Sequence, residues 1–386
     1  MNETTDLIIF WVVVLSRFLV PFTIPRFPLP GILACLIIDA VDQTIFQQFT
    51  NLNLDGYQGY DKALDIYYLV IAYIATLRNW TNLFAFRVSR FLLYYRLFGV
   101  TLFELTYSGE GPRWLLLIFP NVFEYFFIFY EIVRLRWDPV KMTKRFVIVS
   151  AAAIWIFIKI PQEMWIHILQ LDTTDFIKEE IFGVPADTPF SEILADNLWL
   201  ILLAAVVAVL IVVIARLIIK RLPPADWPFS IDANDHLDVS PDVVENREMS
   251  TGSERFFNNV LFEKIALVSL VSIIFAQILP DVKATTLQLA VAVAFVIIFN
   301  TVFSHWLAGR GTTWRSTLQQ FVAMIVVNFG LVLIYSFLLP AFDGSVNVGN
   351  TLFFVLLLTL LVTMFDRYRP VYEARVALAE QSALAE

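Results

Sequence analysis

Long apolar runs separated by short polar stretches recur along the whole chain. Most of these runs are long enough to cross the roughly 30 Å of hydrocarbon in a bilayer as an α-helix. The predicted membrane spans are residues 7–20, 31–49, 63–80, 83–106, 113–135, 146–170, 197–219, 259–279, 285–307, 318–339 and 350–366. The predicted fold class is therefore all-α, a polytopic integral membrane protein with about 11 transmembrane helices.

The beginning of the chain contains the shortest predicted span, residues 7–20. It follows an acidic stretch and has neither a basic segment before it nor a small-residue cleavage site, so we expect a retained span and not a signal peptide. Four prolines follow it, at positions 21, 25, 28 and 30. Because proline ends or bends a helix, residues 21–30 predict either a loop or a re-entrant corner.

The distribution of basic residues predicts the orientation of the spans. With the N-terminus outside, only four basic residues fall on the outer side: Lys62, Arg113, Lys178 and Lys283. Three lie within spans: Arg90, Arg96 and Lys159. The other 20 of the 27 Lys and Arg residues lie in inner loops, in the tail or at the inner ends of spans. Since basic residues favour the cytoplasmic side, we expect the N-terminus outside and the C-terminus in the cytoplasm.

The composition agrees with the bilayer as the solvent of this protein. Of 386 residues, 59% are hydrophobic and 16% are charged, whereas soluble domains are about a quarter charged. We expect a multi-pass protein of a cell membrane, with the bacterial cytoplasmic membrane as its location. The formal net charge of -8 argues against a nucleic-acid partner. Cys35 is the single cysteine, which excludes an intrachain disulfide and a cysteine metal site.

The polar segments divide the chain into parts. Residues 1–170 form a predicted six-helix membrane domain with a charged, proline-kinked interior, and residues 171–196 an acidic extracytoplasmic loop. Residues 197–375 form a predicted five-helix apolar membrane domain, and residues 376–386 a cytoplasmic tail. Residues 223–257 interrupt the second domain as an acidic cytoplasmic linker, which the Pro, Asp and Ser content predicts to be mobile.

The span at 146–170 carries charged residues where each is costly. Lys159, Glu163 and His167 are spaced i, i+4, i+8 and share one helix face. Pro161 lies between them and predicts a kink. One interpretation is a proton or ion relay along a kinked helix. The other is a structural pair of Lys159 and Glu163 against a neighbouring helix, with His167 at the watery outer end.

The spans at 31–49 and 113–135 have similar polar faces. In the first, Asp39, Asp42, Gln43 and Gln47 share a face, and two desolvated carboxylates one turn apart need a cation, a proton or a basic partner. They could bind a cation or exchange a proton, or each could pair with an arginine of the span at 83–106, which carries Arg87, Arg90 and Arg96. The second span places Asn121, Glu124 and Glu131 on one face, after the mid-span Pro120.

Polar groups in an apolar medium need partners, so we expect these four helices to turn their polar faces toward one another. Near the middle of the membrane the carboxylates then outnumber the basic groups by two, which protons or a cation would relieve. The sequence therefore predicts a membrane transporter or an ion- or proton-conducting protein. The predicted substrate- or ion-binding residues are Asp39, Asp42, Gln43, Arg96, Asn121, Glu124, Lys159, Glu163 and His167.

Three other functions remain open. Arg87, Arg90 and Arg96 suggest voltage sensing, but at 100° per residue Arg96 lies opposite Arg87 on an α-helix. An enzyme acting on a lipid-linked substrate would use Asp55, Asp61 and Asp65 near the outer tyrosines. A non-catalytic structural or assembly subunit of a membrane complex would explain the apolar C-terminal helices, whose main polar residues are Gln277, Asn300, His305 and Asn328.

No cofactor and no metal are expected, because the three histidines are scattered along the chain and no nucleotide-binding motif occurs. The expected partners are the lipid bilayer, a small ion or small-molecule substrate, and either further copies of the chain or a membrane-complex partner.

Overall fold

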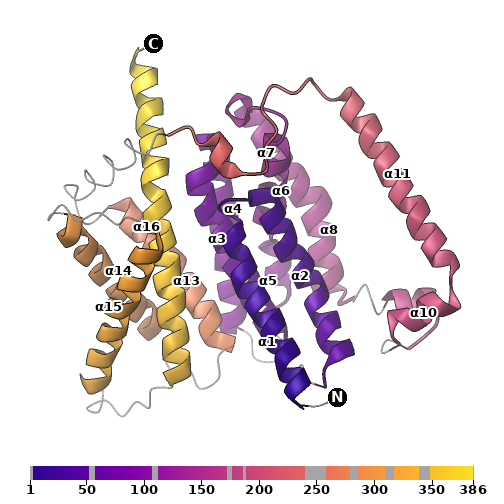
Figure 1. The fold of residues 1–386 in the computed structure, drawn as a ribbon, viewed down its shortest axis with the longest axis horizontal. Helices are drawn as coiled ribbons and strands as arrows, with labels where there is room; N and C mark the ends of the chain where they lie inside the picture. The colour runs from indigo at the N-terminus through magenta and orange to yellow at the C-terminus, as the bar shows by residue number, and fades with distance from the viewer. Residues whose placement is uncertain are drawn as a thin grey trace.

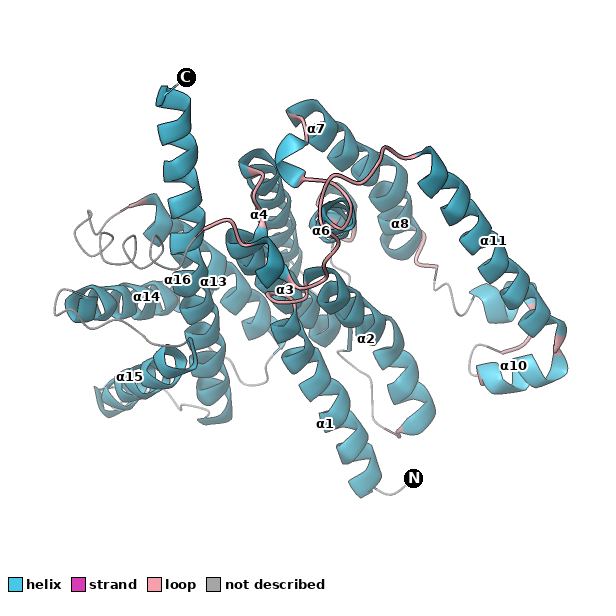
Figure 2. Ribbon diagram, turned by 45° about the horizontal axis from the view of Figure 1, so that its top comes forward, coloured by secondary structure: helices cyan, strands magenta, loops and turns pink. Residues whose placement is uncertain are grey.

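The computed structural model describes residues 3–51, 57–106, 112–171, 176–185, 188–239, 258–278, 285–308, 317–338 and 348–385. These residues form helices joined by loops and contain no strand (Figure 2). The all-helical part of the predicted fold class is confirmed. The α-helices are α1 Glu3–Leu19, α2 Pro28–Phe49, α3 Tyr57–Asn79, α4 Leu83–Thr106, α5 Trp114–Ile118, α6 Val122–Arg134, α7 Lys144–Ala153, α8 Ile160–Glu163, α10 Phe190–Asp196, α11 Trp199–Arg221, α13 Asn259–Ile278, α14 Thr286–Ala308, α15 Thr317–Leu338 and α16 Val348–Ala385.

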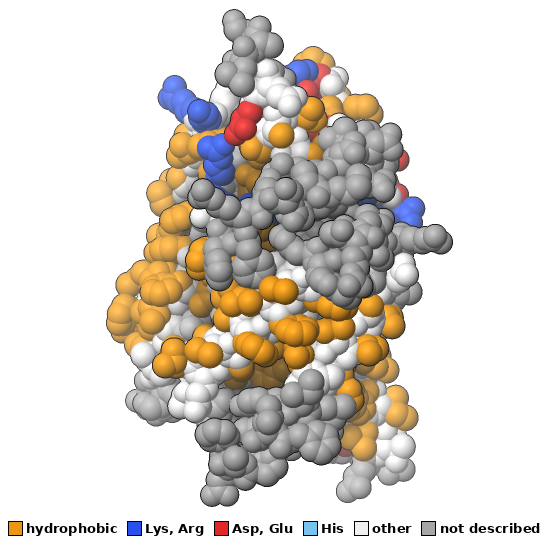
Figure 3. Space-filling model, turned by 90° about the vertical axis from the view of Figure 1, so that its left-hand side faces the viewer, with side chains coloured by type: hydrophobic (Ala, Val, Ile, Leu, Met, Phe, Trp, Pro, Cys, Tyr) orange, Lys and Arg blue, Asp and Glu red, His pale blue; other side chains and the backbone are white. Residues whose placement is uncertain are grey.

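Several of these helices suit a membrane. Within the described residues, seven helical stretches are long and apolar enough to cross one: Thr4–Thr23, Pro28–Phe49, Trp114–Arg134, Lys144–Ile168, Trp199–Arg221, Asn259–Gln277 and Thr286–Ser304. Figure 3 shows hydrophobic side chains gathered in a broad band across the face on the α14–α15 side, with Lys and Arg side chains above the band. The chain is therefore compatible with a multi-pass membrane protein. The other predicted spans also fall on helices, and their number stays a prediction.

Helix α3 lies at the centre of the fold. Its seven consecutive residues Leu69 to Ala75 are all 0% exposed, as expected for a helix that is covered on every side. α2, α4, α13 and α16 pack on it, and Figure 1 shows the C-terminal helices beside the N-terminal ones. The two predicted membrane domains therefore share one core around α3.

The corner between α1 and α2 is compact. It consists of the 3₁₀ turn η1, Val20–Thr23, followed by a turn that leads to Pro28 at the start of α2. Proline suits the first turn of a helix because its missing N–H would have no helical partner there. A Cβ added at Gly31 would lie 2.9 Å from Cα of Ile24, so the corner requires glycine at this position. Residues 21–30, for which the sequence predicted a loop or a re-entrant corner, thus form a short 3₁₀ turn and the beginning of α2.

The sixth predicted span adapts to Pro161 by widening its turns. It runs through α7, the π-helical segment η3 (Ile154–Lys159), α8 and a second π-helical segment η4 (Met164–Ile168). Proline cannot donate a backbone hydrogen bond and crowds the preceding turn. The N–H of Ile160 donates to the carbonyl of Trp155, five residues back, which is the π-helical pattern. Such π-helical turns within α-helices are frequent at functional sites.

Residues 223–239, the described part of the predicted linker, are docked on one end of the helices. Lys141 Nζ lies 2.7 Å from Asp226, and Arg26 Nε lies 3.0 Å from Asp232. Lys141 holds the pKa of the Asp226 carboxyl below its usual range through their hydrogen bond. Their acidic side chains thus match the basic helix ends, and the mobility of the linker stays a prediction.

Helix α16 closes the same end of the molecule. The buried guanidinium of Arg375 donates to the carbonyls of Trp80 (2.8 Å) and Arg78 (3.0 Å), at the C-terminus of α3. It also pairs with Asp238 at 2.6 Å. The last carbonyls of a helix have no partners within the helix, so Arg375 caps α3 and ties the docked segment to it.

Candidate functional site

A single arginine, Arg17 of α1, holds four carboxylates. Its guanidinium forms ion pairs with Asp39 and Asp42 of α2 and with Asp61 and Asp65 of α3. The two contacts to α3 are both 2.8 Å. The Arg17 side chain is 2% exposed and that of Asp42 0%, whereas Asp39, Asp61 and Asp65 are 22%, 31% and 25% exposed. We name these five residues the arginine cluster.

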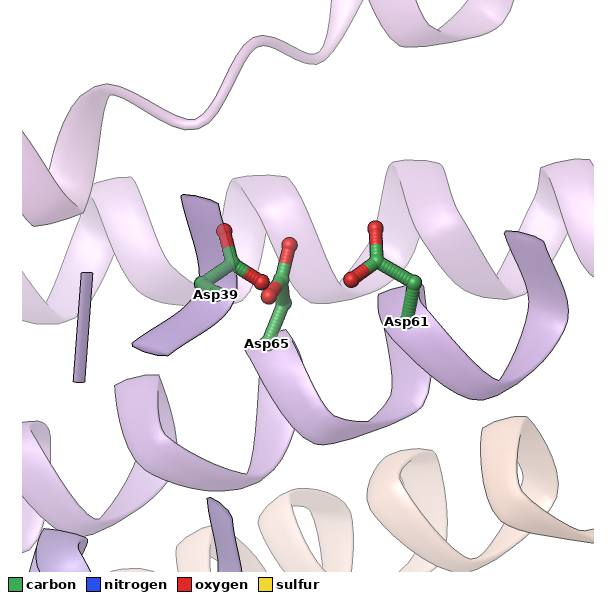
Figure 4. Close-up of side chains that lie close together, drawn as sticks. All are labelled: Asp39, Asp61 and Asp65. Carbon is green, nitrogen blue, oxygen red and sulfur yellow. The ribbon is translucent and has the colours of Figure 1, made fainter. Parts of the chain in front are cut away.

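Helix geometry explains why these side chains meet. Asp61 and Asp65 lie one turn apart on α3, as do Asp39 and Asp42 on α2, so each pair occupies one face. Figure 4 shows the carboxylates of Asp39, Asp61 and Asp65 turned to the same side, from two helices. Side chains on a helix lean toward its N-terminus, and Arg17 thereby reaches toward the first turns of α3, where Asp61 lies.

Three of the carboxylates are close enough to share a cation. One oxygen each of Asp39, Asp61 and Asp65 lies within 4.8 Å of the others, and oxygen ligands suit hard cations such as Ca²⁺ and Mg²⁺. However, the Arg17 guanidinium contacts all three. A metal bound there would lie beside a fixed positive charge, which disfavours a metal relative to protons.

The fifth predicted span is interrupted at mid-span. α5 ends at Ile118 and α6 begins at Val122, with Pro120 between them. Arg96 Nη1 of α4 donates to the carbonyl of Phe119 at 2.9 Å, and the N–H of Asn121 donates to Glu163 Oε1 at 3.1 Å. Backbone freed from a helix at membrane depth must find partners. Here charged side chains of neighbouring helices supply them.

Around this break lies a second group of charges, which we name the break cluster: Arg96, Asn121, Glu124, Lys159, Glu163 and His167. Lys159 Nζ is 3.8 Å from Glu124 Oε2, and His167 Nε2 is 3.0 Å from Glu163 Oε2. Arg96 Nη1 is 3.9 Å from Glu163 Oε1. Asn121 bridges the two acids, because its side-chain amide donates to Glu124 Oε2 at 3.1 Å while its backbone binds Glu163.

Tyr68 of α3 joins the two clusters. Its hydroxyl donates a hydrogen bond to Glu124 Oε1, and the side chain is 3% exposed. Asp65 of the arginine cluster precedes it by three residues on the same helix face. The buried face of α3 thus leads from Arg17 to the helix break.

The two clusters together carry more acid than base. Six carboxylates face three basic side chains, which are Arg17, Arg96 and Lys159. Three negative charges are therefore unmatched if every carboxylate is ionised. Unpaired charges cost several kcal/mol each in a low-dielectric interior, so some carboxylates should hold protons, or share them as coupled groups do.

The structure brings together most of the predicted site. Six of the nine predicted site residues form the break cluster. Two more, Asp39 and Asp42, lie in the arginine cluster. Gln43 is exposed and does not join them. Of the alternatives for Asp39 and Asp42, the structure contains pairing with an arginine, but that arginine is Arg17 and not one of the span at 83–106.

Sequence reasoning missed Arg17, Tyr68, and the place of Asp61 and Asp65 in this site. Positions 61, 65 and 68 form the same i, i+4, i+7 stripe that revealed the other polar faces. Arg17 lies three residues before the end of the predicted span at 7–20, so it was counted among the basic residues at inner ends of spans. In the structure the helical stretch continues to Thr23. The inward reach of Arg17 follows from the lean of helical side chains toward the N-terminus.

The structure also bears on the voltage-sensing and enzyme hypotheses. On α4 Arg87 is exposed and Arg96 buried, on opposite sides as an α-helix requires. Asp61 and Asp65 are engaged with Arg17, which weighs against the free carboxylates that a lipid-linked substrate would need; Asp55 lies outside the described residues.

The C-terminal helices are less apolar in their contacts than their sequence suggested. Glu263 of α13 lies 2.9 Å from Arg369 of α16 and 3.5 Å from Arg90 of α4, and it accepts a hydrogen bond from Tyr73 of α3. This network ties α13 and α16 to the N-terminal helices. It lies near the start of α13, away from the helix break.

Comparison of the chain with protein-family models, with curated proteins and with solved structures found no match in any of the three. The function is therefore argued from the site.

Gly99 of α4 controls the position of the helix break. A Cβ at Gly99 would lie 2.1 Å from Cβ of Phe119, an atom that moves only with its backbone. Gly99→Ala should therefore displace the break and destabilise the protein by about 1–3 kcal/mol, as overpacking does. Denaturation in detergent measures this, with Gly330→Ala as the control because a Cβ there meets no atom of the described residues within 4 Å. Equal stability of the two variants would contradict the prediction.

Proposed function

We propose that the protein is a membrane transporter coupled to protons or to a small cation, and that the arginine cluster and the break cluster form its binding site. The observation that carries this proposal is the surplus of three negative charges among buried or half-buried groups. Ionisable groups inside a membrane are costly, and they mark ion or substrate pathways. A helix broken at its middle is a recurrent feature of transporter sites.

A carrier suits the geometry better than an open channel. Asp39, Asp61 and Asp65 are partly exposed, whereas the opposite end of α3 is closed by tightly packed side chains. There the Trp80 ring stacks on Tyr130 with 3.7 Å between ring centroids and donates to Glu131 at 2.8 Å. The docked segment 223–239 covers that end as well. This asymmetry favours a site that is open to one side at a time.

We further propose eleven spans in the bacterial cytoplasmic membrane, with the N-terminus outside and the C-terminus inside. Contacts of residues 223–239 support the alternation of spans. This segment follows the seventh predicted span. It contacts Arg26 after the first span, Arg78 in the last turn of the third, Lys141 after the fifth and Arg375 after the last. All of these positions lie at or beyond the ends of odd-numbered spans, which supports placing them on the same side of the membrane.

Flux measurements in liposomes test the transport proposal. The purified protein is reconstituted, and proton, Na⁺ and K⁺ movement is followed with dyes under imposed gradients. Asp39→Asn and Glu163→Gln remove one surplus charge each without removing bulk. We expect flux in the wild type and a fall of about tenfold or more in each variant, because an intramembrane acid that binds the ion is lost. The transport proposal fails if wild-type vesicles match empty ones for every ion.

A structural or assembly subunit is the second candidate. Helix α11 favours it, since none of its side chains is buried and Figure 1 shows the helix at the edge of the molecule. Such a helix can face lipid, a second copy or another membrane protein. In that case the charged groups of the two clusters serve as structural ion pairs.

A further inference from the structure

The helix break contains a hydrogen-bond donor and an acceptor without protein partners. Asn121 is 7% exposed, and its Oδ1 is buried and accepts no hydrogen bond within the described part of the chain. Arg96 is 8% exposed, and its Nε–H is likewise buried and donates to no described group. Buried polar atoms are nearly always satisfied, by protein or by ordered water.

Asn121 and Arg96 both approach the same carboxylate, that of Glu163. The N–H of Asn121 binds Glu163 Oε1 at 3.1 Å, and Arg96 Nη1 is 3.9 Å from that oxygen. The side-chain N–H of Asn121 donates to the carboxylate of Glu124. The break therefore has an unused acceptor, an unused donor and two carboxylates close together. Those are the two to four polar partners that hold a buried water molecule.

We propose that the helix break binds a water molecule that relays protons between Glu124 and Glu163, and that the coupling ion of this transporter is the proton. The inference rests on the proposed transport function. The relay has a hydrogen-bonded continuation at each end, because His167 contacts Glu163 and Tyr68 donates to Glu124. It joins the partly exposed His167, through the break, to the face of α3 that carries Asp65.

The charges around the break favour a proton over a metal ion. Glu124 and Glu163 are each accompanied by a cation, Lys159 at 3.8 Å and Arg96 at 3.9 Å. Lys159 also donates to Gln162 at 3.0 Å and lies 4.0 Å from the centre of the Tyr125 ring. A metal ion would be repelled by both cations and would have to displace them from their acids.

A proton needs no such displacement. The water accepts the proton of the Glu163 carboxyl and, in the same step, passes one of its own protons to the Glu124 carboxylate, so the water stays neutral. Glu163 is left as a carboxylate and Glu124 becomes a protonated carboxyl. Atoms and charge balance, and no other reactant is needed.

Substitutions at Asn121 test the relay, with Asn328 of α15 as a matched control. Asn328 is 2% exposed and also has a buried Oδ1 without a described partner, but it lies in the C-terminal helices. Leucine at either position removes the polar atoms at similar volume. Asn121→Ser leaves a hydroxyl and room for water, which guards against loss through misfolding alone. Each variant is reconstituted as a monodisperse sample, and proton, Na⁺ and K⁺ fluxes are measured.

We expect proton flux and no Na⁺ or K⁺ flux in the wild type. Asn121→Leu should lower proton flux about tenfold or more, since one barrier-determining hydrogen bond is lost. Asn121→Ser should restore part of it, and Asn328→Leu should retain it. Equal proton flux in Asn121→Leu and Asn328→Leu would overturn the relay and leave the transport proposal standing. Flux of Na⁺ or K⁺ without protons would have the same meaning, whereas absence of all flux in the wild type would overturn both proposals.

Discussion

Arg17→Met should destabilise the protein more than any other single substitution in the two clusters. The change leaves Asp39, Asp42, Asp61 and Asp65 facing one another without their common cation. Removing one partner of a buried ion pair costs about 3–5 kcal/mol, and here one cation serves four acids. Denaturation of the purified protein in detergent measures the loss. Arg87→Met, at an exposed position of α4, is the control and should change stability little.

A second substitution separates the loss of charge from the loss of packing. Asp42 has a side chain that is 0% exposed, so its carboxylate is the acid least able to reach water. Asp42→Asn in the Arg17→Met background should therefore recover part of the lost stability, since one buried negative charge is removed. Additive losses from the two substitutions would contradict the view that Arg17 acts by compensating these acids.

The sequence predicted the helices well because each must bury its backbone polar groups within itself in a membrane. It also predicted the break cluster, since the spacing of Lys159, Glu163 and His167 on one helix and of Asn121 and Glu124 on another defines faces. Faces alone do not say which helices meet. The alternative that took the partners of Asp39 and Asp42 from the span at 83–106 was wrong for that reason, because the topology places α1 beside α2 and Arg17 reaches both acids.

Local backbone geometry was the other part that sequence patterns could not supply. Pro120 and Pro161 each predicted a disturbed helix, but the sequence did not show what form each disturbance takes. At Pro120 the helix stops at Ile118 and resumes at Val122, whereas near Pro161 it continues through π-helical turns. The difference follows from neighbours. The freed carbonyl of Phe119 has Arg96 as a partner, and such a partner lets a helix end inside the membrane.

Lys159→Met should also be strongly destabilising, because it leaves Glu124 buried beside an apolar side chain. Lys159 is 3% exposed and Glu124 3%, and the expected loss is about 3–5 kcal/mol. The double variant Lys159→Met with Glu124→Gln removes both charges and should recover most of that stability, since a neutral pair of similar volume is often tolerated. Denaturation in detergent of the single and double variants forms the cycle.

Proton flux of the same double variant separates the two readings of the break cluster. If Lys159 and Glu124 are only a structural pair, restoring stability restores whatever the protein does, and flux returns with it. If Glu124 carries a proton, glutamine cannot replace it, and the double variant should be stable but inactive. Recovery of both stability and flux would remove Glu124 from the transport mechanism, and would leave Tyr68, which donates to it, without a role there.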